Sequence, residues 1–163
     1  MVKDNLSVEN AKILFRNFAG RGGQFNPEGR RNFCVLLDFE KGTKLQEEGW
    51  KVKWAKQRDP DEDPQAYLPV AVSYDHIPPK IVMITSSKQT LLDESNVMVI
   101  DTAEIKNVNL IIRPYNWDVN GQKGVKAYLK TMYIELEEDE FAYLYKDIPE
   151  TSDDYMHDDK GPF

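Results

Sequence analysis

The strongest constraint on the fold is a pair of long segments joined by a tight turn. Residues 108–117 and 124–136 flank Asp118-Val119-Asn120-Gly121, and Asn-Gly is a strong signal for a β-hairpin. From Val125 to Lys130 the second segment alternates apolar side chains with Lys or Tyr. This alternation is typical of a strand with one apolar face. The sequence therefore predicts two long antiparallel strands.

The rest of the chain adds strands and little helix. Short helices are predicted at 39–48 and 94–101, the second capped by Asp93. Pro69 indicates an edge strand or a bulge. Residues 139–146 fit either a turn of helix or a last short strand. Further strands are predicted at 11–18, 31–37, 50–57, 66–74 and 80–85.

This order of elements indicates an all-β fold with minor α content. Many short strands joined by turns, with one or two short helices, form either a small barrel or a sandwich. A five-stranded Greek-key barrel with additional hairpin strands fits the pattern, and the periodicity does not choose between barrel and sandwich. The chain of 163 residues suits one domain plus a tail.

Acidic residues are concentrated at the end of the chain. The net charge is −7, and residues 147–163 hold six acids and one base, Lys160, so this segment carries −5 and the rest −2. Two stretches of the body are basic, residues 11–35 with +4 and 111–134 with +3. We therefore expect a domain at 1–146 and a flexible acidic tail at 147–163, an arrangement typical of interaction tails.

Several classes of protein are not indicated. No apolar run approaches the ~18 residues of a membrane span, and MVKDNLSVENAK lacks the apolar region of a signal peptide. Cys34 is the single cysteine, which excludes an intramolecular disulfide and a cysteine-based zinc site. We expect a cytoplasmic protein with no membrane, metal or cofactor.

The common catalytic motifs are absent from the sequence. The sequence has no phosphate-binding loop of the G-x-x-x-x-G-K-[ST] type and no H-E-x-x-H. Cys34 lies in an apolar strand, which favours a buried, inert thiol over a nucleophile. The acidic run at 59–63 has the oxygen ligands of a Mg²⁺ site, but a solvated loop is favoured. We therefore expect a protein that is not an enzyme.

Aromatic and basic residues alternate in three stretches, and this is the positive signal for function. Proteins hold single-stranded nucleic acid by neutralising phosphates with Lys and Arg and by stacking aromatic rings on bases. The candidate nucleic-acid-binding residues are Arg16, Arg21, Phe25, Arg30, Arg31, Lys51, Lys53, Tyr115, Trp117, Lys123, Lys126, Tyr128 and Lys130.

Strand alternation divides the aromatic residues between core and surface. Trp50 and Trp54 share a face with Val52, which favours the core and leaves Lys51 and Lys53 exposed. The same interpretation places Phe15 and Phe33 in the core. Phe25, among glycines and arginines, is expected to be exposed, and so is the strand face that carries Lys126, Tyr128 and Lys130.

The tail carries a family resemblance. It ends Asp158-Asp159-Lys160-Gly161-Pro162-Phe163, which resembles the acidic Pro-Phe tip of bacterial single-stranded DNA-binding proteins, although Lys160-Gly161 interrupts the acids. It is also similar to phage replication proteins whose acidic tails end in an aromatic residue. The body, from ILFRNFAGRGGQFNPEGRRNFCVLL to RPYNWDVNGQKGVKAYLK, resembles phage and prophage single-stranded DNA-binding proteins.

The resemblance implies an oligonucleotide-binding (OB) barrel that binds single-stranded DNA without sequence preference. It also implies that the tail recruits replication or recombination proteins, through Asp153, Asp154, Asp158, Asp159, Pro162 and Phe163. Two alternatives stay open, a protein-interaction or phage structural module and a metal-dependent nucleic-acid enzyme or its accessory subunit. The sequence does not decide between a monomer and a homodimer.

Overall fold

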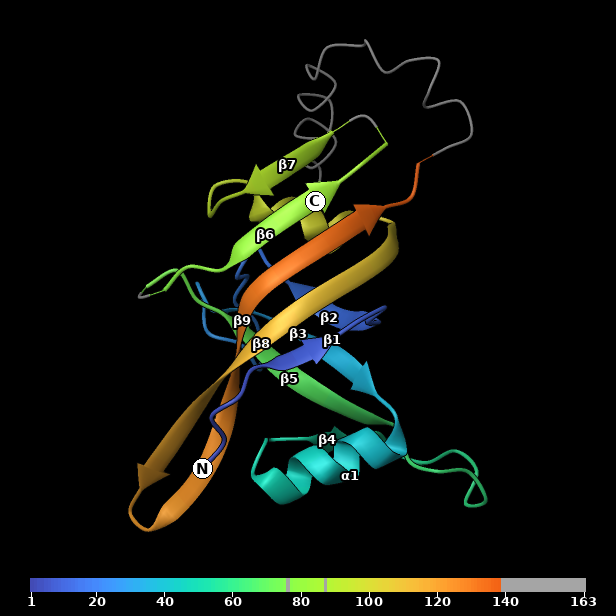
Figure 1. Cartoon of the computed structure of the whole chain (residues 1–163), viewed down its shortest axis with the longest axis vertical. Helices are drawn as coiled ribbons and strands as arrows, with labels where there is room; N and C mark the ends of the chain where they lie inside the picture. The colour runs from blue at the N-terminus through green and yellow to red at the C-terminus, as the bar shows by residue number, and fades with distance from the viewer. Residues whose placement is uncertain (76, 87, 139–163) are drawn as a thin grey trace.

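The fold is organised around the predicted hairpin, in a computed structural model that describes residues 1–75, 77–86 and 88–138. Strands β8 (Ile105–Val119) and β9 (Gln122–Leu136) pair antiparallel and cross the molecule diagonally, with their turn projecting at the lower left (Figure 1). Asn120 and Gly121 have φ of 53° and 82°. A type I′ turn requires positive φ at both central residues, so the predicted hairpin is confirmed.

The other strands extend this hairpin into one mixed sheet. Its main path runs β1-β8-β9-β5-β3-β2. Strand β9 pairs in parallel with β5 where Tyr128 faces Ala71, and further along in parallel with β6. Strand β4 pairs with β5, and β7 pairs with β6. The bounds are β1 (Leu6–Val8), β2 (Ile13–Asn17), β3 (Arg31–Leu37), β4 (Lys53–Trp54), β5 (Ala66–Val72), β6 (Lys80–Ile84) and β7 (Gln89–Leu92).

One segment near the start of the chain joins the two ends of the sheet. Strand β1 pairs with β8, and β2, which follows four residues later, pairs with β3. Between them the Ala11 backbone N–H donates to the Val108 carbonyl at 2.7 Å. Residues 6–17 therefore act as one bent strand that completes a partly open, five-stranded barrel. The expected all-β fold with minor α content is confirmed.

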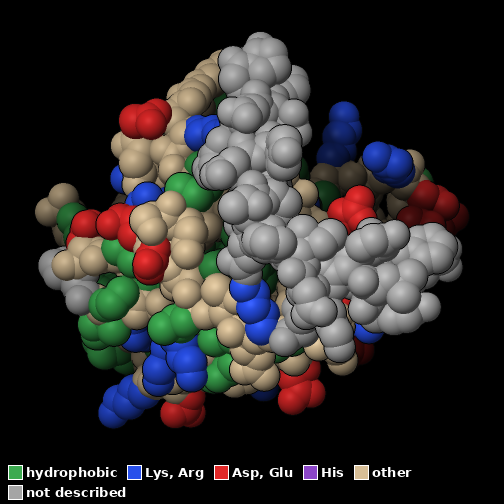
Figure 2. Space-filling view, turned by 90° about the horizontal axis from the view of Figure 1, so that it is seen from above, with side chains coloured by type: hydrophobic (Ala, Val, Ile, Leu, Met, Phe, Trp, Pro, Cys, Tyr) green, Lys and Arg blue, Asp and Glu red, His purple; other side chains and the backbone are tan. Residues whose placement is uncertain are grey.

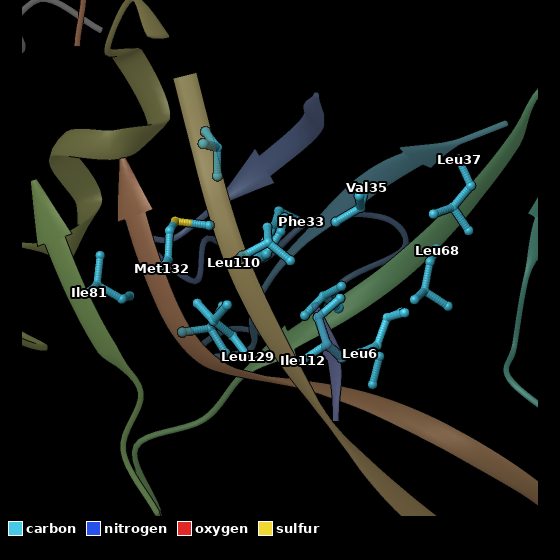
Figure 3. Close-up of a cluster of buried hydrophobic side chains, with 14 of the residues drawn as sticks. Leu6, Phe33, Val35, Leu37, Leu68, Ile81, Leu110, Ile112, Leu129 and Met132 are labelled. Carbon is cyan, nitrogen blue, oxygen red and sulfur yellow. The ribbon is translucent and has the colours of Figure 1, made fainter. Parts of the chain in front are cut away.

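The barrel encloses a core to which its strands contribute inward side chains. Leu6, Phe33, Leu68 and Ile112 point into the same interior (Figure 3). The Phe33 ring stacks on Phe18 with centroids 5.2 Å apart. Burial of apolar surface at roughly 25 cal/mol per Å² is what stabilises such a barrel.

A bulge changes which residues of β9 face inward. Ile112 pairs with Leu129, whereas Ile111 pairs with Thr131, so Lys130 is the extra residue. Leu129 and Met132 are both buried as a result, although they are three residues apart. A bulge of this kind bends a strand and strengthens its twist.

Helix α1 (Phe39–Glu48) closes the lower end of the barrel (Figure 1) and confirms the prediction for 39–48. Asp38 caps it by accepting a hydrogen bond from the Lys41 backbone N–H at 2.7 Å. Gly49 ends it with a left-handed φ of 105°. Trp50, which is 3% exposed, and the half-buried Trp54 pack as the sequence predicted.

Several predicted boundaries were wrong. The helix expected at 94–101 is a 3₁₀ helix, η1 (Val97–Thr102), and its N-cap is Asn96 rather than Asp93. Of the strand expected at 50–57, only β4 is a strand, while Trp50 forms an isolated bridge with Val125. The short strands β1 and β7 were not predicted. The prediction for residues 139–146 lies outside the described residues.

Two side chains lie in surroundings other than those predicted. Pro69 is neither on an edge strand nor at a bulge, because β5 pairs with β3 on one side and with β4 and then β9 on the other. Pro69 falls where the partner changes from β4 to β9. Phe15 is not a core residue, because it is 67% exposed. In the described part of the chain, none of the helices has the length and apolar character needed to cross a membrane.

Replacing Gly42 by Ala should destabilise the fold. Gly42 of α1 faces strand β5, and a Cβ at Gly42 would lie 2.4 Å from the Cβ of Ala66. Alanine favours a helix over glycine by about 1 kcal/mol, but overpacking costs about 1–3 kcal/mol. We expect Gly42→Ala to lower the free energy of unfolding in urea by about 1 kcal/mol. The exposed Lys44→Ala should change it by less than about 0.5 kcal/mol, and a stabilised Gly42→Ala protein would contradict the packing.

Candidate nucleic-acid interface

The outer face of the β8–β9 hairpin gathers aromatic rings and positive charges. Tyr115 and Tyr128 meet edge to face with centroids 6.0 Å apart. The Arg113 guanidinium carbon lies 5.2 Å and the Lys126 Nζ 5.1 Å from the centre of the Tyr128 ring. Each contact has the geometry of a cation–π interaction. Together with Trp117, these residues form what we call the arm cluster.

Trp117 lies flat against the hairpin because its cross-strand partner is a glycine. Trp117 pairs with Gly124. A Cβ at Gly124 would lie 2.6 Å from the indole Cζ2 and 2.9 Å from Nε1. The indole therefore occupies the space that a side chain would fill. The half-buried ring keeps part of its surface in solvent on the same strand face as Tyr115.

The loop between β2 and β3 presents three more predicted residues. Arg21, Phe25 and Arg30 are all exposed, Phe25 to 91%. The loop is held from within by Asn26, whose side-chain amide donates to the carbonyls of Arg21, Pro27 and Arg30 at 2.9–3.2 Å. Asn26 also accepts a hydrogen bond from the Asn32 amide of β3 at 2.9 Å. An internally bonded loop can present its outer side chains with little ordering cost.

Two of the predicted arginines are engaged inside the protein. Arg16 donates to the carbonyls of Ile100 and Ala103 at 2.7 and 2.8 Å, which fastens η1 to β2. Arg31 donates to the Phe18 carbonyl at 2.9 Å and forms an ion pair with Glu94 at 3.0 Å. Arg31 also lies on the same strand face as the buried Phe33. These guanidinium groups therefore have partners other than phosphate.

The remaining predicted lysines lie at the surface. Lys51 and Lys53 are exposed, as the alternation with Trp50 and Val52 predicted. Lys123 and Lys130 are exposed as well. Lys130 occupies the bulge of β9, so it does not continue the regular row begun by Lys126 and Tyr128.

Cys34 lies on the outer face of β3 between β2 and β5, and is half-buried. Burial raises the pKa of the thiol above its ordinary value, and the nearby charge of Lys53 opposes this effect. A raised pKa keeps the group protonated at neutral pH. The thiol is inert in this state, because the thiolate is the reactive form. This agrees with the expectation of an inert cysteine.

In the acidic loop at 59–63, the carboxylate of Asp59 stabilises a turn. Asp59 accepts a hydrogen bond from the Asp61 backbone N–H at 3.0 Å. Across residues 1–75, 77–86 and 88–138, no three His, Cys, Asp or Glu side chains gather into a group that could hold a metal ion. His157 and the predicted tail residues lie outside these ranges.

Sequence reasoning missed three residues of the outer face. Arg113 was counted in a basic stretch but not among the candidates. Phe15 was assigned to the core, and Tyr67 was not singled out. The signal for Arg113 is the turn itself, because counting back from Asn120 and forward from Gly121 pairs Arg113 with Tyr128. For Phe15 the sequence offers no such signal, since its position depends on a bulge.

The surface seen from above carries mixed charge. Lysine and arginine side chains lie among hydrophobic ones, with acidic side chains scattered between them (Figure 2). On this view the positive charge is therefore local rather than a broad patch.

A small, partly open β-barrel with an aromatic and basic outer face is the architecture of oligonucleotide-binding folds. The C-terminally truncated single-stranded DNA-binding protein from bacteriophage Enc34 has a similar fold, with TM-score 0.53 and 12% identity over 83% of this chain and 87% of that chain. The Enc34 protein in complex with ssDNA matches with the same score and identity over 83% and 88%. These likenesses confirm the expected OB-like barrel.

The sequence places the chain within a family. Residues 1–162 match the family described as “Putative phage ssDNA-binding domain”, and the chain belongs to it. No curated protein matches the sequence at a significant level. The expected family resemblance is therefore confirmed.

Replacing Gly124 by Ala should move the Trp117 indole without unfolding the protein. The new Cβ would occupy the site of the ring, and a half-exposed side chain can swing to another rotamer. We expect stronger acrylamide quenching of tryptophan fluorescence and a change in unfolding free energy below about 1 kcal/mol. Lys123→Ala, one residue away, should leave the quenching unchanged. Equal quenching in all three proteins would show that Gly124 does not hold the ring.

Proposed function

We propose that this protein binds single-stranded DNA without sequence preference through the outer face of its sheet. The observation that carries the proposal is the arm cluster, in which Tyr128 is flanked by Arg113 and Lys126 at 5.2 and 5.1 Å. Family membership supports it. So does the similarity to a structure described as a single-stranded DNA-binding protein in complex with ssDNA.

The chemistry of the arm cluster explains why binding would not depend on sequence. Every base has a π-face, so stacking on Tyr115, Trp117 or Tyr128 discriminates weakly between bases. Arg113 and Lys126 carry charges that attract phosphates, which are the same at every nucleotide. The exposed Arg21, Phe25 and Arg30 of the β2–β3 loop and Lys123 near the turn supply further contacts of the same two kinds.

We further propose that the protein coats and protects DNA in phage replication or recombination. The acidic tail, residues 147–163, then has two roles. Its end, with Pro162 and Phe163, recruits replication or recombination proteins. Its net charge of −5 lets it compete with DNA for the basic outer face, because a tethered segment acts at an effective concentration on the order of millimolar.

A titration with labelled oligo-dT, followed by fluorescence anisotropy, tests the main proposal directly. Saturable binding supports it, and no binding at low salt would favour the structural or protein-interaction alternative. Cleavage of the oligonucleotide that requires Mg²⁺ would instead favour the metal-dependent enzyme.

Tyr128→Ala should weaken DNA binding by about 1–3 kcal/mol, the contribution of one stacked base. The fold should persist, because Tyr128 lies on the outer face, opposite to the buried Ala127 and Leu129. Trp54→Ala is the comparison, since Trp54 packs on Gly42 and Phe39 and its loss should cost about 3–5 kcal/mol of stability. Anisotropy and urea unfolding measure the two effects. If Tyr128→Ala unfolds while Trp54→Ala stays folded without binding DNA, the roles of the two faces are reversed.

Deleting residues 147–163 should tighten DNA binding at low salt. The gain should shrink as salt rises, because attraction between exposed charges is screened beyond about 10 Å at 0.1 M salt. Deleting Phe163 alone should leave DNA affinity nearly unchanged and abolish capture of replication or recombination proteins. The three proteins are compared with one oligonucleotide at two salt concentrations. Equal affinities at low salt would contradict competition by the tail.

A further inference from the structure

A strained, exposed aromatic residue lies on the outer face, away from the arm cluster. Phe15 has a left-handed φ of 53° and is 67% exposed. Such a backbone conformation is an outlier for a bulky residue and carries an energetic cost. Exposing the ring gives up the burial that would offset that cost. Strain of this kind is concentrated at functional sites.

A bulge in β2 is what turns Phe15 outward. Ile13 pairs with the inward-facing Val35, so regular alternation would also turn Phe15 inward. The register shifts between Leu14 and Asn17, and the Phe15 ring instead meets Tyr67 at a centroid distance of 6.1 Å. Bulges commonly redirect a side chain next to a binding site.

Tyr67 brings a positive charge to this aromatic pair. It lies between the buried Ala66 and Leu68, so its ring is on the outer face of β5. Directly opposite on β4 is the exposed Lys53. Among the described residues, Lys53 has no carboxylate within ion-pair distance. Phe15, Tyr67 and Lys53, which we call the second station, therefore offer two rings and an available cation.

The second station lies on the same sheet face as the arm cluster, at a defined spacing. Tyr128 pairs with Ala71, which is four residues from Tyr67 along β5. At 3.3 Å per residue this separates the two sites by about 13 Å. Between them the outer side chains are short, namely Pro69 and Ala71 on β5 and Cys34 on β3. Adjacent bases of a stacked strand lie about 3.4 Å apart, so two adjacent bases cannot occupy both sites.

We propose that the second station binds a base of the same DNA strand that occupies the arm cluster, with intervening nucleotides crossing the low strip formed by Pro69, Ala71 and Cys34. This rests on the proposed function and adds the path of the strand across β9, β5 and β3. The site then needs a minimum length of DNA to reach full affinity.

The test combines an oligo-dT series of about 3 to 12 nucleotides with variants of each site. Phe15→Gly removes the ring and relieves the left-handed strain, since glycine adopts positive φ freely. Its melting temperature should not fall. Its affinity for the longer oligonucleotides should fall about fivefold or more, whereas the shortest ones, which reach only the arm cluster, should bind as they do to the unaltered protein.

Tyr67→Ala should repeat this dependence on length, and Phe15→Trp should restore tight binding of long oligonucleotides. Leu91→Ala is the matched control, because Leu91 of β7 is 66% exposed and lies outside both sites. If Phe15→Gly and Tyr67→Ala bind every length normally while Tyr128→Ala binds weakly, the second station is overturned and the proposed function stands. If the unaltered protein binds no oligonucleotide, both fail.

Discussion

The backbone pairing of β9 connects the core, the barrel and the candidate interface. Strand β9 pairs with β8 along its length, with β5 at Ala71 and with β6 over its last third. Its inward residues are buried, and its outward ones, Lys126 and Tyr128, belong to the arm cluster. A slip of one residue would exchange the two sets, so the register that packs the core also positions the rings and charges of the outer face.

Much of this arrangement follows from local signals. The Asn120-Gly121 turn fixes the hairpin register, and the capped helix at Phe39–Glu48 and the apolar strand at Arg31–Leu37 have the predicted bounds. Alternation also separates Trp50 from Lys51. These features depend on residues close in sequence, where turn chemistry, capping and periodicity act directly.

The arginines and the bulges show where local reasoning fails. Arg16 was expected to contact phosphate, but its partners are carbonyls 84 and 87 residues away, and no local pattern records such a contact. The sequence indicated a core position for Phe15, because apolar and basic residues alternate around it. The register shift in β2 turns the Phe15 side chain to the other face of the sheet. Such a bulge depends on the neighbouring strand in the tertiary structure, which local sequence does not reveal. Composition indicated which kinds of residue form the candidate interface. Which individual residues lie together on it depends on how the strands pair in the sheet.

The division of β9 into two faces makes the fold tolerant of divergence. The inner face requires apolar volume, which several residues provide, and such cores accept extensive substitution. Under the proposed function, the outer face requires only flat rings and positive charge, because every nucleotide presents a phosphate and a π-face. Neither demand specifies an identity at a given position. The same architecture can therefore be built from very different sequences, and the Enc34 protein has a similar fold at 12% identity.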